Sequence, residues 1–152
     1  MLEVQNVRTD LLEIGYADIG NPSGKAVVLL HGFPYDIHAF SSVSGILAAN
    51  DFRVLVPFLR GFGGTRFLFR ETIRSGEQSS LGEDLIAFLD ALKIERAVLA
   101  GYDWGGTAAC VAAALHPERV IGLVSAGGYK IQRIAEAINP VQPESEQRYW
   151  YQ

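Results

Sequence analysis

The sequence predicts an α/β fold, with a mostly parallel, doubly wound sheet covered by helices on both faces. Short apolar segments alternate with helical patterns along most of the 152-residue chain, which is typical of parallel βαβ units. Residues 26–30 are continuously apolar, as expected for a strand that is covered on both faces. Residues 101–106 form a glycine-rich turn between a short apolar strand and an alanine-rich helix. This turn places a side chain at the carboxyl end of the sheet.

Composition restricts the classes of protein that remain. The chain is 49% hydrophobic and 20% charged, with a formal net charge of -4, so we expect one domain and no basic surface for nucleic acid. No apolar run reaches the roughly 18 residues of a membrane span, and the N-terminus lacks the features of a signal peptide. The single cysteine, Cys110, excludes an internal disulfide framework and is expected to be a small buried residue. We therefore expect a cytoplasmic protein without a membrane partner.

Each expected element has its own local pattern. Strands are expected at 2–8, 11–17, 26–30, 53–56, 97–100 and 120–125, and helices at 38–49, about 80–92 and 105–115. The first two strands join near Thr9-Asp10 as a hairpin, and the first helix has apolar residues at helical spacing. Ser79 or Ser80 caps the second helix, since Glu83 follows Ser80 at the spacing of a capping box. Residues 57–70 are an aromatic and glycine-rich loop.

The turn around Asp103 has the frame of a nucleophile elbow, with aspartate where an esterase carries serine. Its glycines allow a turn so tight that the middle side chain stands out at the end of the strand. Aspartate side chains have an ordinary pKa of about 3.9, so they are anions at neutral pH and need no base before they attack. Attack of a carboxylate on a saturated carbon that bears a leaving group gives an ester. Asp103 therefore favours epoxide or carbon–halogen substrates over esters or amides.

Four segments in order resemble the α/β-hydrolase superfamily, and within it the branch that uses an aspartate nucleophile. They are His31-Gly32-Phe33-Pro34, Leu59-Arg60-Gly61-Phe62-Gly63-Gly64-Thr65, Gly101-Tyr102-Asp103-Trp104-Gly105-Gly106 and His116-Pro117-Glu118-Arg119-Val120. Epoxide hydrolases and haloalkane dehalogenases are the known members of this branch. The resemblance covers roughly residues 10–128 and implies an α/β-hydrolase core.

The resemblance also implies the roles of particular residues. Asp103 would be the nucleophile, and the backbone N–H groups of Phe33 and Trp104 would form the oxyanion hole. The substrate, a small molecule, would lie against Trp104, His31 and Pro34. No metal and no cofactor is expected. The physical chemistry agrees, because water attacks the ester carbonyl of the nucleophile itself, and donors beside that carbonyl stabilise the charge that develops there.

Two residues depart from the pattern of relatives. Some haloalkane dehalogenases carry a second halide donor, an asparagine, at the position of Phe33, so Phe33 favours epoxide chemistry or a dehalogenase whose second donor lies elsewhere. Trp104 occurs in both groups of enzymes and does not discriminate between them. Many relatives carry an aspartate at the position of Phe58, for which the sequence suggests no consequence.

Hydrolysis of the ester needs a histidine base held by an acid, and in the family both lie on late loops. None of the three histidines, His31, His38 and His116, matches that position. We therefore expect the N-terminal half of such an enzyme, apparently truncated after the sixth strand. Residues 1–128 would be the core, and residues 129–152 the start of the lid or an irregular tail, with a short helix at 131–138 and an aromatic-rich end at 145–152.

The strand at 120–125 would then be an apolar sheet edge with unpaired backbone groups, which favours a homo-oligomer or a swapped dimer. Other interpretations stay open. The chain could be a catalytically incomplete binding relative, or a haloalkane dehalogenase-like protein. A nucleotide-binding domain is disfavoured, because residues 61–65 lack both the Gly-Lys-Ser/Thr sequence of a phosphate-binding loop and the Gly-x-Gly-x-x-Gly spacing. Asp103 could also be a simple helix N-cap.

Overall fold

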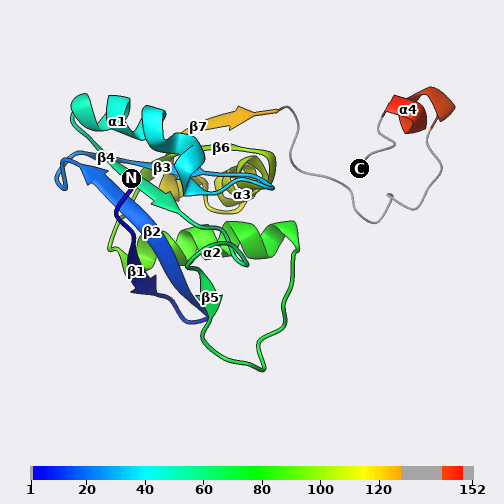
Figure 1. Ribbon diagram of the computed structural model, residues 1–152, viewed down its shortest axis with the longest axis horizontal. Coiled ribbons are helices and arrows are strands. Elements are labelled where there is room, and N and C mark those ends of the chain that lie inside the picture. Colours follow the sequence, from blue (N-terminus) through cyan, green and yellow to red (C-terminus); the bar gives the residue numbers. More distant parts are fainter. Residues whose placement is uncertain (1, 128–141, 149–152) are drawn as a thin grey trace.

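The computed structural model describes residues 2–127 and 142–148. Residues 2–127 form a sheet between helices on both faces (Figure 1). The strands are β1 (Gln5–Arg8), β2 (Leu12–Gly20), β3 (Lys25–Leu30), β4 (Phe52–Pro57), β5 (Arg66–Phe67), β6 (Ala97–Tyr102) and β7 (Val120–Ala126). The helices are η1 (Ile37–Phe40), α1 (Ser41–Ala49), α2 (Gln78–Ala91), α3 (Asp103–Leu115), η2 (Pro117–Arg119) and α4 (Pro143–Arg148). None of the helices within the described ranges is long and apolar enough to cross a bilayer.

The strand order is β1-β2-β4-β3-β6-β7. The four strands β4, β3, β6 and β7 pair in parallel, which confirms the predicted parallel centre. The predicted hairpin, β1 and β2, adds antiparallel strands at one edge. The short β5 also pairs with β2 and was not predicted, because two residues inside a glycine-rich loop are too few to show a strand period.

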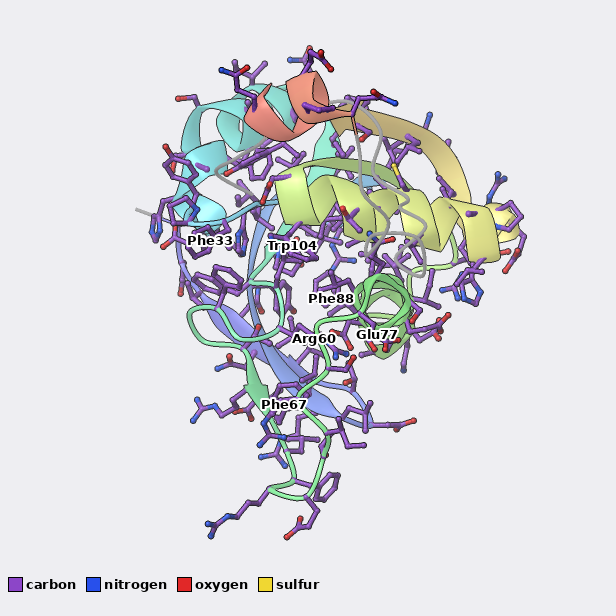
Figure 2. The ribbon with its side chains drawn as sticks, turned by 90° about the vertical axis from the view of Figure 1, so that its right-hand side faces the viewer. Phe33, Arg60, Phe67, Glu77, Phe88 and Trp104 are labelled. Atoms are coloured by element: carbon purple, nitrogen blue, oxygen red, sulfur yellow. The ribbon has the colours of Figure 1, made fainter. Side chains whose placement is uncertain are left out.

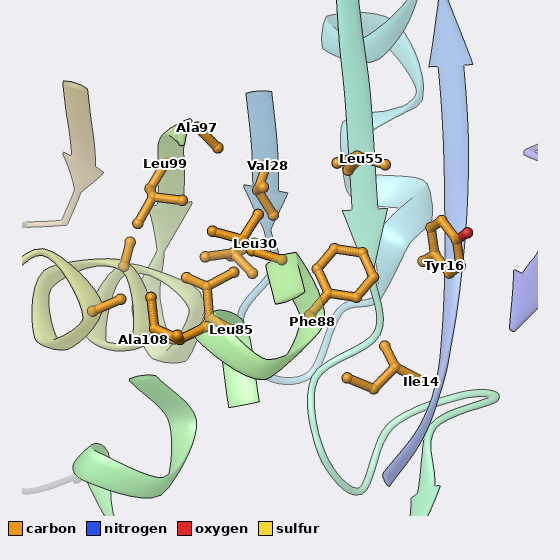
Figure 3. Close-up of a cluster of buried hydrophobic side chains, with 14 of the residues drawn as sticks. Ile14, Tyr16, Val28, Leu30, Leu55, Leu85, Phe88, Ala97, Leu99 and Ala108 are labelled. Atoms are coloured by element: carbon orange, nitrogen blue, oxygen red, sulfur yellow. The ribbon is translucent and has the colours of Figure 1, made fainter. Parts of the chain in front are cut away.

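Two apolar cores lie on opposite faces of the sheet, and β3 contributes to both. Val28 and Leu30 face the larger core, which α2 and α3 cover (Figure 3). Val27 and Leu29 face the smaller core, where Ile37 is fully buried. This alternation explains why the segment has no polar position. The layers fix the carboxyl ends of β3, β4 and β6 at one edge of the sheet, where the candidate site lies.

Several details differ from the sequence prediction. The helix expected at 38–49 is a 3-10 turn followed by α1, and Asp36 caps that turn by accepting the N–H of His38. The capping box was wrong, because α2 begins at Gln78 and its N-cap is Glu77. Cys110 is half-buried rather than buried. The short helix expected at 131–138 lies outside the described residues.

β7 is the outer strand at one edge of the sheet in the described part of the chain, as predicted, and β1 is at the other edge. β7 pairs with β6 alone. Ile121, Leu123 and Val124 are exposed by 43%, 43% and 60%, so this edge combines open backbone groups with apolar side chains.

Candidate active site

The turn between β6 and α3 has the backbone of a nucleophile elbow. Asp103 has φ +52°, a left-handed conformation that is uncommon for any residue other than glycine and costs conformational energy. A Cβ on Gly101 would overlap the backbone of Gly105, and a Cβ on Gly105 would overlap the carbonyl of Leu30. The turn therefore needs glycine on both sides of Asp103, which explains the pattern that the sequence carries.

The carboxylate of Asp103 contacts the loop that follows β3. The backbone N–H of Phe33 donates to Oδ1 of Asp103 at 2.9 Å, across 70 residues of sequence. Gly32 makes room for this contact, because a Cβ there would lie 2.8 Å from Oδ1 and would overlap the Cβ of Asp103. Sequence reasoning gave Gly32 no role, although a glycine directly before an expected donor was the available signal.

The structure argues against a simple capping role for Asp103. The N-cap of α3 is Tyr102, and no side chain caps that helix end. The carboxylate instead accepts its hydrogen bond from a different loop. Its position in the first turn of α3 still favours the anion, since the helix dipole is positive there. Within the described residues, Oδ2 of Asp103 accepts no hydrogen bond.

Two exposed aromatic residues adjoin the carboxylate, since the N–H of Phe33 bonds to it and Trp104 follows it in the chain. Phe33 is 67% exposed and Trp104 is 44% exposed, and Figure 2 labels them next to one another. Pro34, one of the expected substrate contacts, is also exposed. The N–H of Trp104, the second expected oxyanion donor, makes no hydrogen bond to Asp103 within the described part of the chain. The structure therefore brings together the carboxylate and one of the two expected donors.

His31 lies beneath the site and joins two loops. Its side chain is fully buried, its Nε2 accepts the N–H of Leu59 at 3.1 Å, and its Nδ1 lies 3.2 Å from the carbonyl of Gly32. Because Nε2 accepts, the proton of the neutral ring is on Nδ1, which donates to Gly32. Both ring nitrogens are occupied by backbone groups, so a substrate would meet the loops that His31 holds rather than its ring.

The apolar surroundings of His31 keep it neutral. Burial lowers its pKa, because the charged imidazolium is less well solvated inside the protein. The rings of Phe58 and Phe62 pack edge-on against it, with centroids 6.4 and 4.9 Å away. Phe58 thus supplies an apolar neighbour at the position where many relatives carry a carboxylate.

A buried ion pair ties the loop after β4 to α2. Arg60 donates to both carboxylate oxygens of Asp84 at 2.6 and 2.7 Å. It also donates to the carbonyls of Ser75 and Ser80. Burial raises the pKa of Asp84, and the guanidinium of Arg60 opposes this shift. Sequence reasoning included Arg60 in a motif but missed this pairing, because its partners lie 15 to 24 residues away.

All three histidines of the chain are engaged away from Asp103. His38 contacts Asp36 at the start of η1. His116 pairs with Glu83 at 2.8 Å and so links the end of α3 to α2. Both lie at the surface as expected, and Glu83 serves this pair rather than the predicted capping box.

Known proteins resemble this chain in sequence and in fold. A protein of Klebsiella pneumoniae subsp. pneumoniae, provisionally named an epoxide hydrolase, has a solved structure similar to this chain, with a TM-score of 0.93 and 46% identity, covering 98% of this chain and 49% of that one. An epoxide hydrolase from Vigna radiata has a TM-score of 0.79 and 26% identity, covering 99% and 46%. Epoxide hydrolase A of Mycobacterium tuberculosis is 33% identical over 119 residues, which are 78% of this chain and 36% of that protein.

The chain spans about half or less of the length of these relatives. The family model described as alpha/beta hydrolase fold matches residues 25–151, which include β3, the elbow and the loops that meet there. The chain belongs to the α/β-hydrolase fold family.

Proposed function

We propose that this chain carries the nucleophile part of an epoxide hydrolase-like active site, with Asp103 as the nucleophile. The hydrogen bond from Phe33 N–H to Oδ1 is the observation that carries the proposal. It distinguishes the two carboxylate oxygens, since one is held by the protein and the other is open to a substrate. The names of the relatives, several of which are epoxide hydrolases, support the choice of substrate class.

The reaction follows from the two oxygens. Oδ2 attacks a ring carbon of the epoxide, the carbon–oxygen bond breaks, and the epoxide oxygen takes up a proton from an acid or from water. Water then attacks Cγ of the resulting ester and gives a proton to a base, which the three histidines of this chain do not supply, and negative charge develops on Oδ1, where Phe33 N–H already donates. Such a preorganised donor is typically worth about 3 kcal/mol in the transition state. Collapse of this intermediate releases the diol and restores the carboxylate.

The test uses intact-mass spectrometry and peptide mapping after exposure to benzyl bromide or styrene oxide. A Cys110→Ser background removes the thiol from competition. We expect one stable ester on Asp103, formed faster from the halide, because bromide leaves without a proton donor. Asp103→Asn should abolish the adduct. Asp51→Asn is the matched control, because Asp51 is also an aspartate with a left-handed backbone, φ +66°.

We further expect no steady turnover by the 152-residue chain, because none of its three histidines contacts Asp103 and hydrolysis of the ester needs a base. Repeated turnover would instead show that another residue of the chain serves as the base for hydrolysis of the ester.

One observation favours a second function, that of a binding relative without chemistry. Each histidine is already held by another partner, so the chain offers no ready base. An unmodified Asp103 after prolonged exposure to both reagents, together with saturable binding of a diol, would favour this alternative.

A further inference from the structure

Thr65, the last residue of the motif at 59–65, has no role in the proposed reaction, yet it is buried beside the loops that form the site. Only 6% of Thr65 is exposed. Its hydroxyl accepts the backbone N–H of Gly15 at 3.2 Å and lies 2.8 Å from the carbonyl oxygen of Phe58. Since a carbonyl oxygen can only accept, the hydroxyl proton points to Phe58. Thr65 therefore accepts from β2 and donates to the loop after β4.

The peptide group between Phe58 and Leu59 continues this direction to His31. The carbonyl of Phe58 accepts the hydroxyl of Thr65, and the N–H of Leu59, in the same peptide group, donates to Nε2 of His31 at 3.1 Å. Hydrogen bonds that share a group polarise one another. A bond to the carbonyl oxygen therefore makes the N–H of this peptide a stronger donor.

The ring of His31 and a second peptide group continue the same direction to Asp103. With Nε2 accepting, the ring proton is on Nδ1, which donates to the carbonyl of Gly32 at 3.2 Å. The N–H of that peptide group belongs to Phe33 and donates to Oδ1 of Asp103 at 2.9 Å. One peptide group is thus held by His31 at its oxygen and by Asp103 at its nitrogen.

These five hydrogen bonds form one relay from Gly15 to Asp103, with a single direction throughout. A hydroxyl, a peptide group, an imidazole and a second peptide group link each bond to the next. The first four bonds are buried, where hydrogen bonds are electrostatically stronger than in water. Every donor hydrogen is turned towards the Asp103 end of the relay. Negative charge develops at that end during the proposed hydrolysis of the ester.

We propose that Thr65 is a positioning residue for the oxyanion donor, the N–H of Phe33, which it orients and polarises through His31. The inference rests on the proposed role of Asp103. It gives a function to a hydroxyl that contacts neither the carboxylate nor its donor directly.

The first test needs no reaction and uses NMR spectra of the 152-residue chain. Thr65→Val keeps the shape of the side chain and removes the hydroxyl, whereas Thr65→Ser keeps the hydroxyl. We expect Thr65→Val to move the amide protons of Leu59 and Phe33 and the Nδ1 proton of His31 upfield, because weaker hydrogen bonds deshield their protons less. Thr65→Ser should leave the three protons close to their original positions.

Ser44→Ala is the matched control for the loss of a buried hydroxyl. Ser44 is 1% exposed, and its hydroxyl donates to the carbonyl of Ser41 within α1, outside the relay. This variant should not move the amide proton of Phe33.

A double-mutant cycle separates transmission along the relay from a general loss of packing. His31→Phe interrupts the relay in its middle, so Thr65→Val should no longer move the amide proton of Phe33 in that background. An equal movement with and without His31 would overturn the proposal, as would an unmoved Phe33 proton in a folded Thr65→Val chain.

Thermal unfolding verifies that each variant is folded, and the unchanged chain supplies a test that needs no variant. It should show a scalar coupling across the hydrogen bond between the nitrogen of Leu59 and Nε2 of His31, together with a proton on Nδ1. The absence of either signal would overturn the proposal.

The second test measures the oxyanion step itself. Asp103 is esterified with benzyl bromide in the Cys110→Ser background, and excess hydroxylamine then serves as both nucleophile and base. Its nitrogen attacks Cγ and gives a proton to a second hydroxylamine. The bond from Cγ to Oδ2 breaks, benzyl alcohol leaves after taking up a proton, and Asp103 becomes a hydroxamic acid. Because negative charge passes through Oδ1, we expect Thr65→Val to slow this step about two- to fivefold, and Thr65→Ser to match the unchanged chain.

The two tests separate this inference from the proposed function. Amide protons that move as expected, without any esterification of Asp103, would retain the relay and remove the proposed function. Esterification of Asp103 followed by equally fast cleavage in Thr65→Val and Thr65→Ser would do the reverse.

Discussion

At the level of single residues, the conformation and contacts of Asp103 are set by neighbours from three loops. Gly101 and Gly105 allow its left-handed backbone. Gly32 lets the next N–H in its loop reach Oδ1. His31 ties that loop to the one after β4. The position of one carboxylate oxygen therefore depends on buried contacts several residues away.

Gly32→Ala tests this dependence. The new Cβ would overlap Asp103, so the carboxylate or the loop must move, and small displacements of reacting groups can cost about 100-fold in rate. We expect the rate of ester formation on Asp103 to fall by roughly that factor. Gly45→Ala is the control, and its rate should match that of the unchanged chain.

The pH dependence of stability tests the neutral state of His31. Its folded pKa lies below the ordinary 6.5, so the unfolded chain binds more protons between the two values. The part of the free energy of unfolding that neutral His31 contributes is therefore fully present above pH 6.5 and is lost as the pH falls below it. Urea unfolding from about pH 5 to about pH 8 measures this slope. The free energy of unfolding of His31→Gln should change less with pH over this range. An equal pH dependence in both chains would contradict the neutral state assigned to His31.

At the level of elements, the loop between β4 and α2 is held by one buried ion pair. Arg60 and Asp84 have side chains only 9% and 16% exposed, and Arg60 also lies over the ring of Phe67 at 5.6 Å. Arg74 approaches the same ring at 4.1 Å. The loop thus has fixed attachment points, and Leu59 within it also carries the hydrogen bond to His31.

Asp84→Ala would leave the guanidinium of Arg60 buried without its counter-charge. Breaking a buried pair in this way typically costs about 3–5 kcal/mol, and we expect this loss in chemical unfolding. Asp90→Ala is the comparison, because Asp90 pairs with Arg119 while its own side chain is 61% exposed. It should cost less than about 1 kcal/mol. Equal losses in the two variants would show that burial does not set the strength of these pairs.

Elements with a strong local period could be predicted from the sequence. The hairpin, the buried strand β3 and the elbow were found in this way. The contact between Phe33 and Asp103 was expected from the resemblance to the α/β-hydrolase superfamily. The start of α2 was missed, because its N-cap, Glu77, makes no side-chain capping bond that a sequence pattern would show. The role of Asp84 was missed, because its partner Arg60 lies 24 residues away.

At the level of the whole molecule, β7 combines a backbone edge that no other described strand pairs with and exposed apolar side chains. We expect such an edge to be covered by self-association of the chain. Light scattering after size exclusion should give a mass above the 16.6 kDa of one chain. Ile121→Lys with Val124→Lys should lower this mass toward one chain, whereas Ile46→Lys, on exposed α1, should not. A mass of 16.6 kDa at every concentration of the unchanged chain would contradict the expectation.

The central claim is that Asp103 reacts through Oδ2 while Phe33 holds Oδ1. A crystal structure of the chain after reaction with benzyl bromide tests it most directly. The account predicts continuous density from Oδ2 of Asp103 to the benzyl carbon, with Oδ1 still about 2.9 Å from the N–H of Phe33. An ester on Oδ1, with the bond to Phe33 broken, or an adduct on another residue with Asp103 unmodified, would contradict it.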